Sequence, residues 1–277
     1  MAMERPYGIV LADTITKLPA EAAEAVVVSG SHGGVFPAAC AVQAGVRAVI
    51  LHDAGIGRDE AGVGCLDHCM LHGVAAATVD TMSCRIGDAA DMLQRGVISR
   101  VNPLALTVGA RPGMTVEEAA EALLLAPVSG LSGDAPNETR EEVSVPDGRR
   151  GIVIMDSASL VQDSDDGKIV VTASHGALIG GNKANALRCD AFAALFNDAG
   201  GGPEGWGFSR LSALDERRIA GATVSAGSAR IGNGRSTYED GILSAVNDVA
   251  KFHGLRVGMS ALEACEILAL TEIRSPL

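Results

Sequence analysis

Aromatic side chains are scarce in this chain of 277 residues, because Phe, Trp and Tyr together make up only 3% of it. Small and aliphatic side chains take their place, since hydrophobic residues still account for 47% and glycine occurs 34 times. This composition suits helices that pack closely against a sheet. A chain of this length can bury a sizeable core, so we expect a globular protein built on aliphatic packing.

Long apolar runs are also lacking, and no segment has the length of a membrane span. The first residues, MAMERPYGIV, lack the basic start and the apolar stretch of a signal peptide. The six cysteines show no regular spacing of the kind that marks a disulfide framework. We therefore expect reduced thiols in a cytoplasmic protein.

Basic residues are outnumbered, and the formal net charge is −12. Like charges repel, so this balance argues against a surface that binds nucleic acid or an anionic membrane. It does not exclude a small anionic substrate, because one or two arginines in a cleft override the overall sign. We expect a small-molecule substrate as partner and leave a homo-oligomer open.

Several segments of the chain occur twice. VVVSGSHGG at Val26 is matched by IVVTASHGA at Ile169, and AATVDTMSCRIGD at Ala76 by GATVSAGSARIGN at Gly221. Two copies with so long a period indicate fused lobes rather than a solenoid. A pseudo-two-fold relation between the lobes is the natural arrangement.

The matched segments divide the chain into a first repeat at 1–127, a polar linker at 128–147 and a second repeat at 148–277. Apolar strand runs without polar alternation are typical of parallel strands buried on both faces. We predict an α/β fold that is internally duplicated, in which each lobe has a mostly parallel sheet flanked by helices. The elements expected in the first repeat are strands at 7–12, 25–30, 47–52 and 74–79, and helices at 36–44, 60–72, 91–108 and 115–125. Pro103 conflicts with the third of these helices.

Polar residues follow the predicted strands at matching places in both repeats. They are Asp13, Ser31, His32, Asp53, Ser83 and Arg85 in the first repeat, and Asp156, Ser174, His175, Asp198, Ser228 and Arg230 in the second. Ligands of open parallel sheets bind outside the carboxyl ends of the strands. We therefore expect these loops to form the functional site.

A serine between small residues at a strand-to-helix turn can present its hydroxyl as a nucleophile. A histidine beside it can serve as acid or base near neutral pH, and an aspartate can orient that histidine. The predicted catalytic residues are Ser31, His32 and Asp53 with their matches Ser174, His175 and Asp198. The alternative is structural, because serine and aspartate commonly cap helices and a histidine can bond to a backbone carbonyl.

Arg85 and Arg230 can each hold a carboxylate through two hydrogen bonds, or can form salt bridges between the lobes. Lys183 has no basic counterpart in the first repeat. The other residues that we predict to bind substrate are Asp13, Gly33, Ser83, Asp156, Gly176 and Ser228.

No cofactor is predicted, although a divalent metal held by Asp13, His32 and Asp53 stays open. The segment CLDHCMLH is a weaker candidate for a metal site, because the sequence offers no second segment with further ligands.

These patterns predict a hydrolase that acts on a small anionic molecule with a cyclic amide-like or ester-like bond. The first alternative is a metal-dependent hydrolase or lyase. The second is a protein that binds a small metabolite without chemistry. In the simplest reading, the repeated loops only cap helices and join the lobes.

Overall fold

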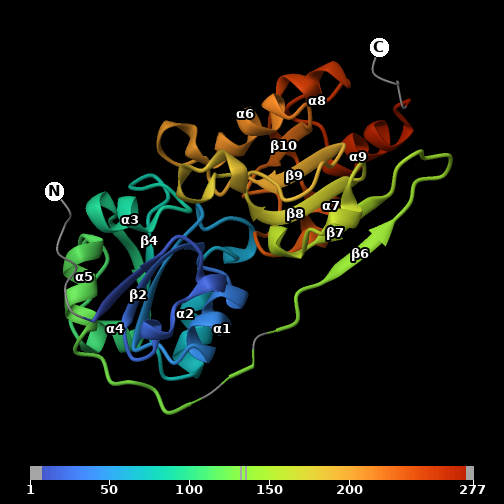
Figure 1. Cartoon of the computed structure of the whole chain (residues 1–277). Coiled ribbons are helices and arrows are strands. Elements are labelled where there is room, and N and C mark those ends of the chain that lie inside the picture. Colours follow the sequence, from blue (N-terminus) through green and yellow to red (C-terminus); the bar gives the residue numbers. More distant parts are fainter. Residues whose placement is uncertain (1–7, 132, 135, 273–277) are drawn as a thin grey trace.

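The computed structural model describes residues 8–131, 133–134 and 136–272, and it contains two mixed β-sheets flanked by helices (Figure 1). This confirms the predicted α/β class. The first lobe comprises the first sheet with α1 to α5, and the second lobe comprises the second sheet with α6 to α9. Within the described residues, none of the helices has the length and apolar character required to cross a membrane.

The first sheet has the strand order β1-β2-β3-β4-β5. Its strands are β1 (Ile9–Ala12), β2 (Val26–His32), β3 (Ala48–His52), β4 (Ala75–Val79) and β5 (Ile98–Val101). The first four strands are parallel, and β5 runs antiparallel to β4. The sheet is therefore mostly parallel, as expected, and the antiparallel edge strand β5 was not predicted.

The second sheet has the order β11-β10-β9-β8-β7-β6. Its strands are β6 (Arg140–Val143), β7 (Ile152–Met155), β8 (Ile169–His175), β9 (Ala193–Asn197), β10 (Ala220–Val224) and β11 (Leu243–Val246). Strands β7 to β10 are parallel, whereas β6 and β11 run antiparallel to their neighbours. Strand β6 lies within the segment expected as linker, so that segment also contributes an edge strand to the second sheet.

Helices cover both faces of the first sheet, as Figure 1 shows. One face packs on α1 (Val35–Gln43) and α2 (Cys65–Leu71), and the other on α3 (Ala89–Arg95), α4 (Pro103–Thr107) and α5 (Val116–Leu123). Alternate residues of β2 divide between the two cores: Val27 joins the first face, and Val26 and Val28 join the second.

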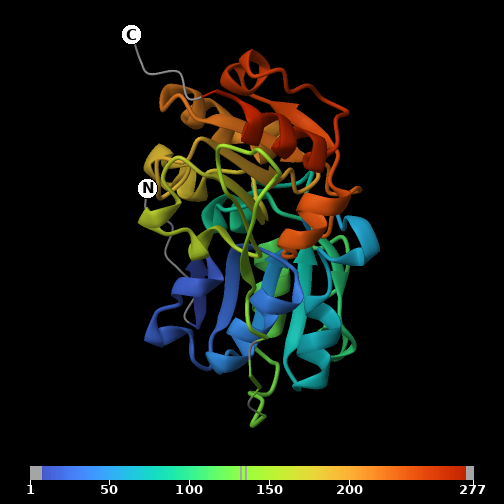
Figure 2. The same ribbon diagram turned by 90° about the vertical axis from the view of Figure 1, so that its right-hand side faces the viewer.

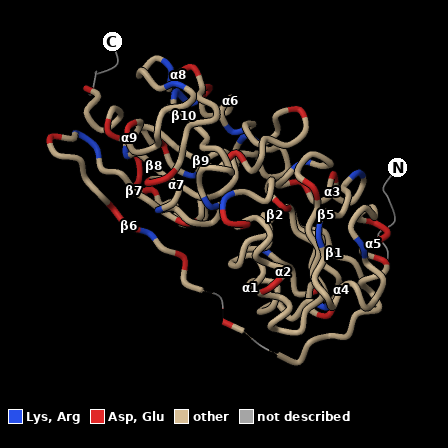
Figure 3. The backbone as a smooth tube through the Cα atoms, turned by 180° about the vertical axis from the view of Figure 1, so that it is seen from behind, with Lys and Arg blue, Asp and Glu red and all other residues tan. Residues whose placement is uncertain are grey.

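In the second lobe, α7 (Gly234–Asp240), α8 (Asp248–Phe252) and α9 (Ala261–Leu270) lie on one face of the sheet, and α6 (Ser209–Glu216) lies on the other. Figure 2 shows the two lobes stacked, with the connecting segment running along one side of both. Figure 3 shows charged residues of both signs spread over the two lobes.

The expected single helix at 91–108 is wrong, because this stretch forms α3, the strand β5 and the short helix α4. Pro103 explains the break. It occupies the first turn of α4, where its missing N–H costs nothing, and the side chain of Asn102 caps that helix by accepting the N–H of Ala105 at 3.0 Å. The helix expected at 115–125 is present as α5, and Thr115 and Glu118 form a capping box at its start.

The two lobes meet backbone to backbone. Gly55 and Gly200 both have positive φ, and a Cβ atom at Gly55 would lie 2.9 Å from the Cα of Gly200. Beside this contact, the Thr81 hydroxyl donates to the carbonyl of Ala199 at 2.8 Å. A buried apolar cluster that draws Ile86 from the first lobe and Ile231 and Trp206 from the second packs beside these glycines and contributes to the contact between the lobes.

Substitution of Gly55 by alanine should loosen this contact. The matched control is Gly45→Ala, because Gly45 has a similar φ of 67° with no atom within 4 Å of the added Cβ. Both variants bear the strain of a left-handed alanine, about 1 kcal/mol, and Gly55→Ala should lose roughly 1–3 kcal/mol more through overpacking. Urea unfolding measures the difference, and equal losses in the two variants would contradict the close contact.

Candidate functional site

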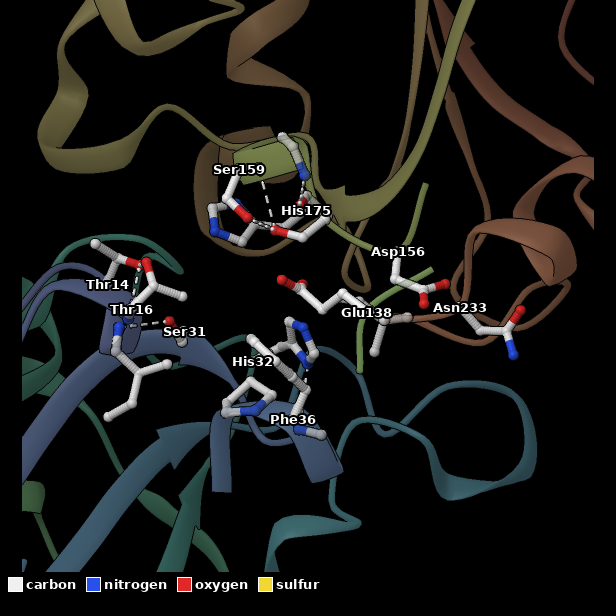
Figure 4. Close-up of a pocket in the computed structure, with 18 of the residues that line it drawn as sticks. Thr14, Thr16, Ser31, His32, Phe36, Glu138, Asp156, Ser159, His175 and Asn233 are labelled. Carbon is white, nitrogen blue, oxygen red and sulfur yellow. Dashed lines mark hydrogen bonds between the residues drawn. The ribbon is translucent and has the colours of Figure 1, made fainter. Parts of the chain in front are cut away.

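A cavity of about 960 Å³ lies between the two lobes. Its wall includes the ends of β2 and β8, the segments that follow β1 and β7, and residues 136–138 of the connecting segment. Of the predicted site residues, the wall contains Ser31, His32, Asp156, Ser174, His175 and Arg230. The carboxyl ends of matching strands in the two lobes thus face one shared space (Figure 4).

The two histidines pack across the lobe boundary. A Cβ atom at Gly232 would lie 3.1 Å from the His32 ring, and a Cβ at Gly87 would lie 3.1 Å from the His175 ring. Gly87 and Gly232 are the glycines of the two matching SxRIG segments. Each histidine therefore contacts the glycine of the opposite lobe, and the contact is reciprocal.

Both histidines are neutral at neutral pH. Burial, with a smaller contribution from nearby His52, lowers the pKa of His32 to about 4. The Nδ1 atom of His32 accepts the N–H of Gly34 at 3.2 Å, which assigns the ring proton to Nε2. Burial also lowers the pKa of His175, and the charge of Arg210 adds to the effect. The Nδ1 of His175 is buried without a hydrogen-bond partner among the described residues.

The two serines accept hydrogen bonds from the backbone. The Oγ of Ser31 accepts the N–H of Ile15 at 3.0 Å, and the Oγ of Ser174 accepts the N–H of Ala158 at 2.9 Å. In each lobe the serine thereby fixes the segment that follows the first parallel strand. Among the described residues, no histidine nitrogen forms a hydrogen bond with either hydroxyl.

The aspartates of the predicted triads lie outside the cavity wall and bind backbone amides. Asp53 accepts the N–H groups of Gly55 and Thr81 at 2.9 and 3.0 Å. Asp198 accepts those of Gly200 and Ala226, both at 2.9 Å. Both carboxylates hold the loops at the lobe contact, so the structure does not bring Ser, His and Asp into one hydrogen-bonded chain.

The aspartates after the first strands bond to the first residue of a helix, whose N-cap is another residue, Asp88 for α3 and Asn233 for α7. Asp13 accepts the N–H of Ala89 at the start of α3, and Asp156 accepts that of Gly234 at the start of α7. The second carboxylate oxygen of Asp156 accepts both the N–H and the hydroxyl of Thr139, at 2.7 and 2.8 Å. In this structure both aspartates, which were predicted to bind substrate, bond to backbone N–H groups instead.

The predicted arginine clamps form ion pairs between the lobes. Arg85 pairs with Glu204 at 2.6 Å and lies over the ring of Trp206. Arg230 pairs with Asp59 at 2.6 Å. The interlobe salt bridge considered for these two arginines is therefore present for both.

The remaining predicted residues lie outside the cavity wall. Lys183 is exposed and pairs with Glu216. The hydroxyls of Ser83 and Ser228 donate to backbone carbonyls within their own turns. Gly33 and Gly176 have no room for a Cβ atom, because carbonyl oxygens of Gly62 and Gly207 approach them closely.

Most residues of the wall were not among the predicted site residues, and two of these, Arg210 and Glu138, bear on the chemistry of the cavity. Arg210 is only 2% exposed and donates to the carbonyls of Ala177, Asn185 and Ala186, with no carboxylate partner among the described residues. Burial lowers its pKa to about 10. Arg210 occupies the position that matches Cys65 of the first repeat. This difference between the repeats is the sequence feature that could have marked Arg210 as a site residue. Glu138 lies in the connecting segment, where the repeat offers no counterpart for comparison.

No group of three or more His, Cys, Asp or Glu side chains within the described part of the chain is arranged to hold a metal ion. Asp13, His32 and Asp53 therefore do not form the ligand set considered for a divalent metal. Cys65 and Cys69 are buried core residues, and burial raises the pKa of both thiols.

Comparison of the chain with models of protein families, with characterised proteins and with solved structures yields no match.

The buried His52 should make stability depend on pH. It accepts the N–H of Ala54 at 3.1 Å and contacts the carbonyl of Cys84, and Asn197 makes the same two kinds of contact in the second lobe. Burial lowers the His52 pKa to about 4. Above pH 6.5 the ring is neutral in both states. Between pH 6.5 and 4 only the unfolded chain binds the proton, so stability falls as the pH falls.

His52→Asn should keep the stability of the wild type at pH 7 and lose about 2 kcal/mol less than the wild type at pH 4.5. Urea unfolding at the two pH values measures this. An unchanged pH dependence in the variant would show that His52 is not the group responsible.

Proposed function

We propose that the protein hydrolyses an amide or ester bond of a small molecule held in the cavity between the lobes. The observation that carries this proposal is that the half-buried His32 and the buried His175, both neutral, line one cavity together with Ser31 and Ser174. The serines and histidines that were predicted to be catalytic therefore line one cavity, although they do not form the predicted Ser–His–Asp chain of hydrogen bonds.

A neutral imidazole can donate a hydrogen bond through its ring N–H although it carries no charge. Because Nδ1 of His32 accepts a backbone N–H, its Nε2–H is the donor. A substrate carbonyl oxygen that accepts this N–H becomes more electrophilic, and the donor stabilises the negative charge that develops on attack. The attacking oxygen comes either from a serine of the wall or from water.

The substrate that we propose is small and anionic. Arg85 and Arg230, which the sequence suggested as anchors, already have carboxylate partners. Arg210 has only carbonyl partners, so a buried positive charge is left at the wall. An anionic group on the substrate would compensate that charge.

We also propose that the lobes are a duplicated unit related by a pseudo-two-fold, in a cytoplasmic protein. The support for duplication is the reciprocal contact of His32 with Gly232 and of His175 with Gly87. The matching bonds of Ser31 and Ser174 support it further. All six cysteines are free thiols, in keeping with a reducing compartment.

A protein that binds a small metabolite without chemistry is the second candidate. It is favoured by the backbone hydrogen bonds that occupy Ser31, Ser174, Asp53 and Asp198. The two candidates differ in turnover, because a binding protein would shift its melting temperature with a ligand and leave that ligand intact.

The proposal is tested with p-nitrophenyl acetate, p-nitroacetanilide, succinimide and small N-acyl amino acids as probes. We expect wild-type turnover of at least one probe and a loss of about 10²-fold or more in a His32→Phe/His175→Phe variant, because phenylalanine keeps a ring but has no N–H donor. His253→Phe is the matched control, since His253 packs on Phe192 outside the cavity wall. Turnover that survives in the double variant would place the chemistry elsewhere.

A further inference from the structure

One carboxylate enters the cavity from the segment that joins the lobes. Glu138 is half-buried and belongs to the cavity wall together with Pro136 and Asn137. Figure 4 shows its carboxylate pointing into the cavity, with His175 on one side and His32 on the other in this view. The joining segment occurs once in the chain, so this group has no counterpart that the repeat could supply.

The residue next to Glu138 is firmly anchored. Thr139 donates its N–H and its hydroxyl to one oxygen of Asp156, at 2.7 and 2.8 Å, and its carbonyl accepts the Asp156 N–H at 3.1 Å. Strand β6 begins at the following residue, Arg140, and pairs with β7. These bonds hold the backbone at Glu138 against the second lobe and set the direction from which its side chain enters the cavity.

The other carboxylates of the wall are already engaged. Asp59 pairs with Arg230, and Glu60 pairs with Arg100 at 2.9 Å. Both oxygens of Asp156 accept hydrogen bonds. Glu138 has no ion pair among the described residues. It is therefore the carboxylate of the wall that is free to exchange a proton with a molecule in the cavity.

We propose that Glu138 is the general base of the hydrolysis and that the nucleophile is water rather than Ser31 or Ser174. This inference rests on the proposed hydrolytic function. The serine hydroxyls lack a histidine partner among the described residues, so no base is in place to take their proton. The histidines are weak bases in this site, because burial disfavours their protonated forms and thereby lowers their pKa.

The proposed hydrolysis has two stages, the attack of water and the departure of the leaving group. Glu138 takes a proton from water, and the water oxygen bonds to the carbonyl carbon while the C=O electron pair moves onto the oxygen that His32 Nε2–H stabilises. When the carbonyl re-forms, the C–N or C–O bond breaks, and its electron pair leaves with the nitrogen or oxygen. Glu138 returns its proton to that leaving group. Water is consumed, and a carboxylic acid and an amine or alcohol are released.

The environment of Glu138 suits a base. Burial raises the pKa of Glu138, the negative charge of Asp156 raises it further, and the Ser157 hydroxyl opposes the rise. Other charged groups of the cavity wall are Lys17, Asp59, Glu60, Arg188, Arg210 and Arg230. A carboxylate whose pKa is raised binds a proton more strongly and is a better base at neutral pH.

The test compares Glu138→Gln, Glu138→Asp and the control Glu142→Gln, which lies on β6 and loses only an ion pair with Lys168. Circular dichroism and the melting temperature establish that each variant is folded. With p-nitrophenyl acetate and p-nitroacetanilide as probes, we expect Glu138→Gln to lower kcat by about 10²–10⁴-fold with a smaller change in KM. Glu138→Asp should recover part of the activity, and Glu142→Gln should match the wild type.

Two further readouts separate a base from a structural residue. The loss in Glu138→Gln should be larger for the anilide than for the ester, because only the poor leaving group needs the returned proton. In the wild type, the apparent pKa of the acid limb of the kcat/KM profile should lie above the ordinary glutamate pKa of about 4.3. This limb should disappear in Glu138→Gln. Rapid quenching and mass analysis of the wild type should find no acyl group on Ser31 or Ser174.

Unaltered kcat in a folded Glu138→Gln variant, or an acyl group trapped on either serine, would overturn the assignment of Glu138 and leave the proposed hydrolysis standing. A wild-type protein that is folded but turns over neither probe nor the other amides and imides would overturn the proposed function and this assignment with it.

Discussion

The approach of two loops, backbone against backbone, is the constraint on which the rest of the structure depends. Gly55 and Gly200 leave no room for a side chain between the lobes, and their positive φ values are conformations that glycine adopts at little cost. Because Asp53 and Asp198 tie these same loops to the ends of β4 and β10, the contact places the carboxyl ends of both sheets opposite each other. The cavity is the space that this arrangement encloses.

Burial at this boundary also decides the electrostatics. His32 and His175 lie where the lobes meet, so water does not stabilise their charged forms, and their pKa values fall. Arg210 remains charged because three carbonyl groups replace its water. The two neutral histidines, one buried cation and one carboxylate from the joining segment are the features on which the proposed hydrolysis of an anionic molecule rests.

Much of the fold could be predicted from local patterns. Apolar runs located the parallel strands at the centre of each sheet, and Thr115 with Glu118 located the start of α5. Strand β5 was missed, because its four residues lie between two short helices and carry no long apolar run. Pro103 was the local sign that the predicted helix had to break, and Asn102 before it is the cap that marks a new start.

The sequence by itself determined where polar residues follow strands, and hence that Ser31, His32, Ser174 and His175 gather at the same ends of two sheets. Only the tertiary structure decided the partners of each side chain. Aspartates that could orient a histidine bind backbone amides instead, and arginines that could hold a substrate pair with acids of the opposite lobe. The physical reason is that the positions of strands and of the residues that follow them are set by local patterning, whereas hydrogen bonds and ion pairs across a lobe boundary depend on how two separately patterned surfaces meet.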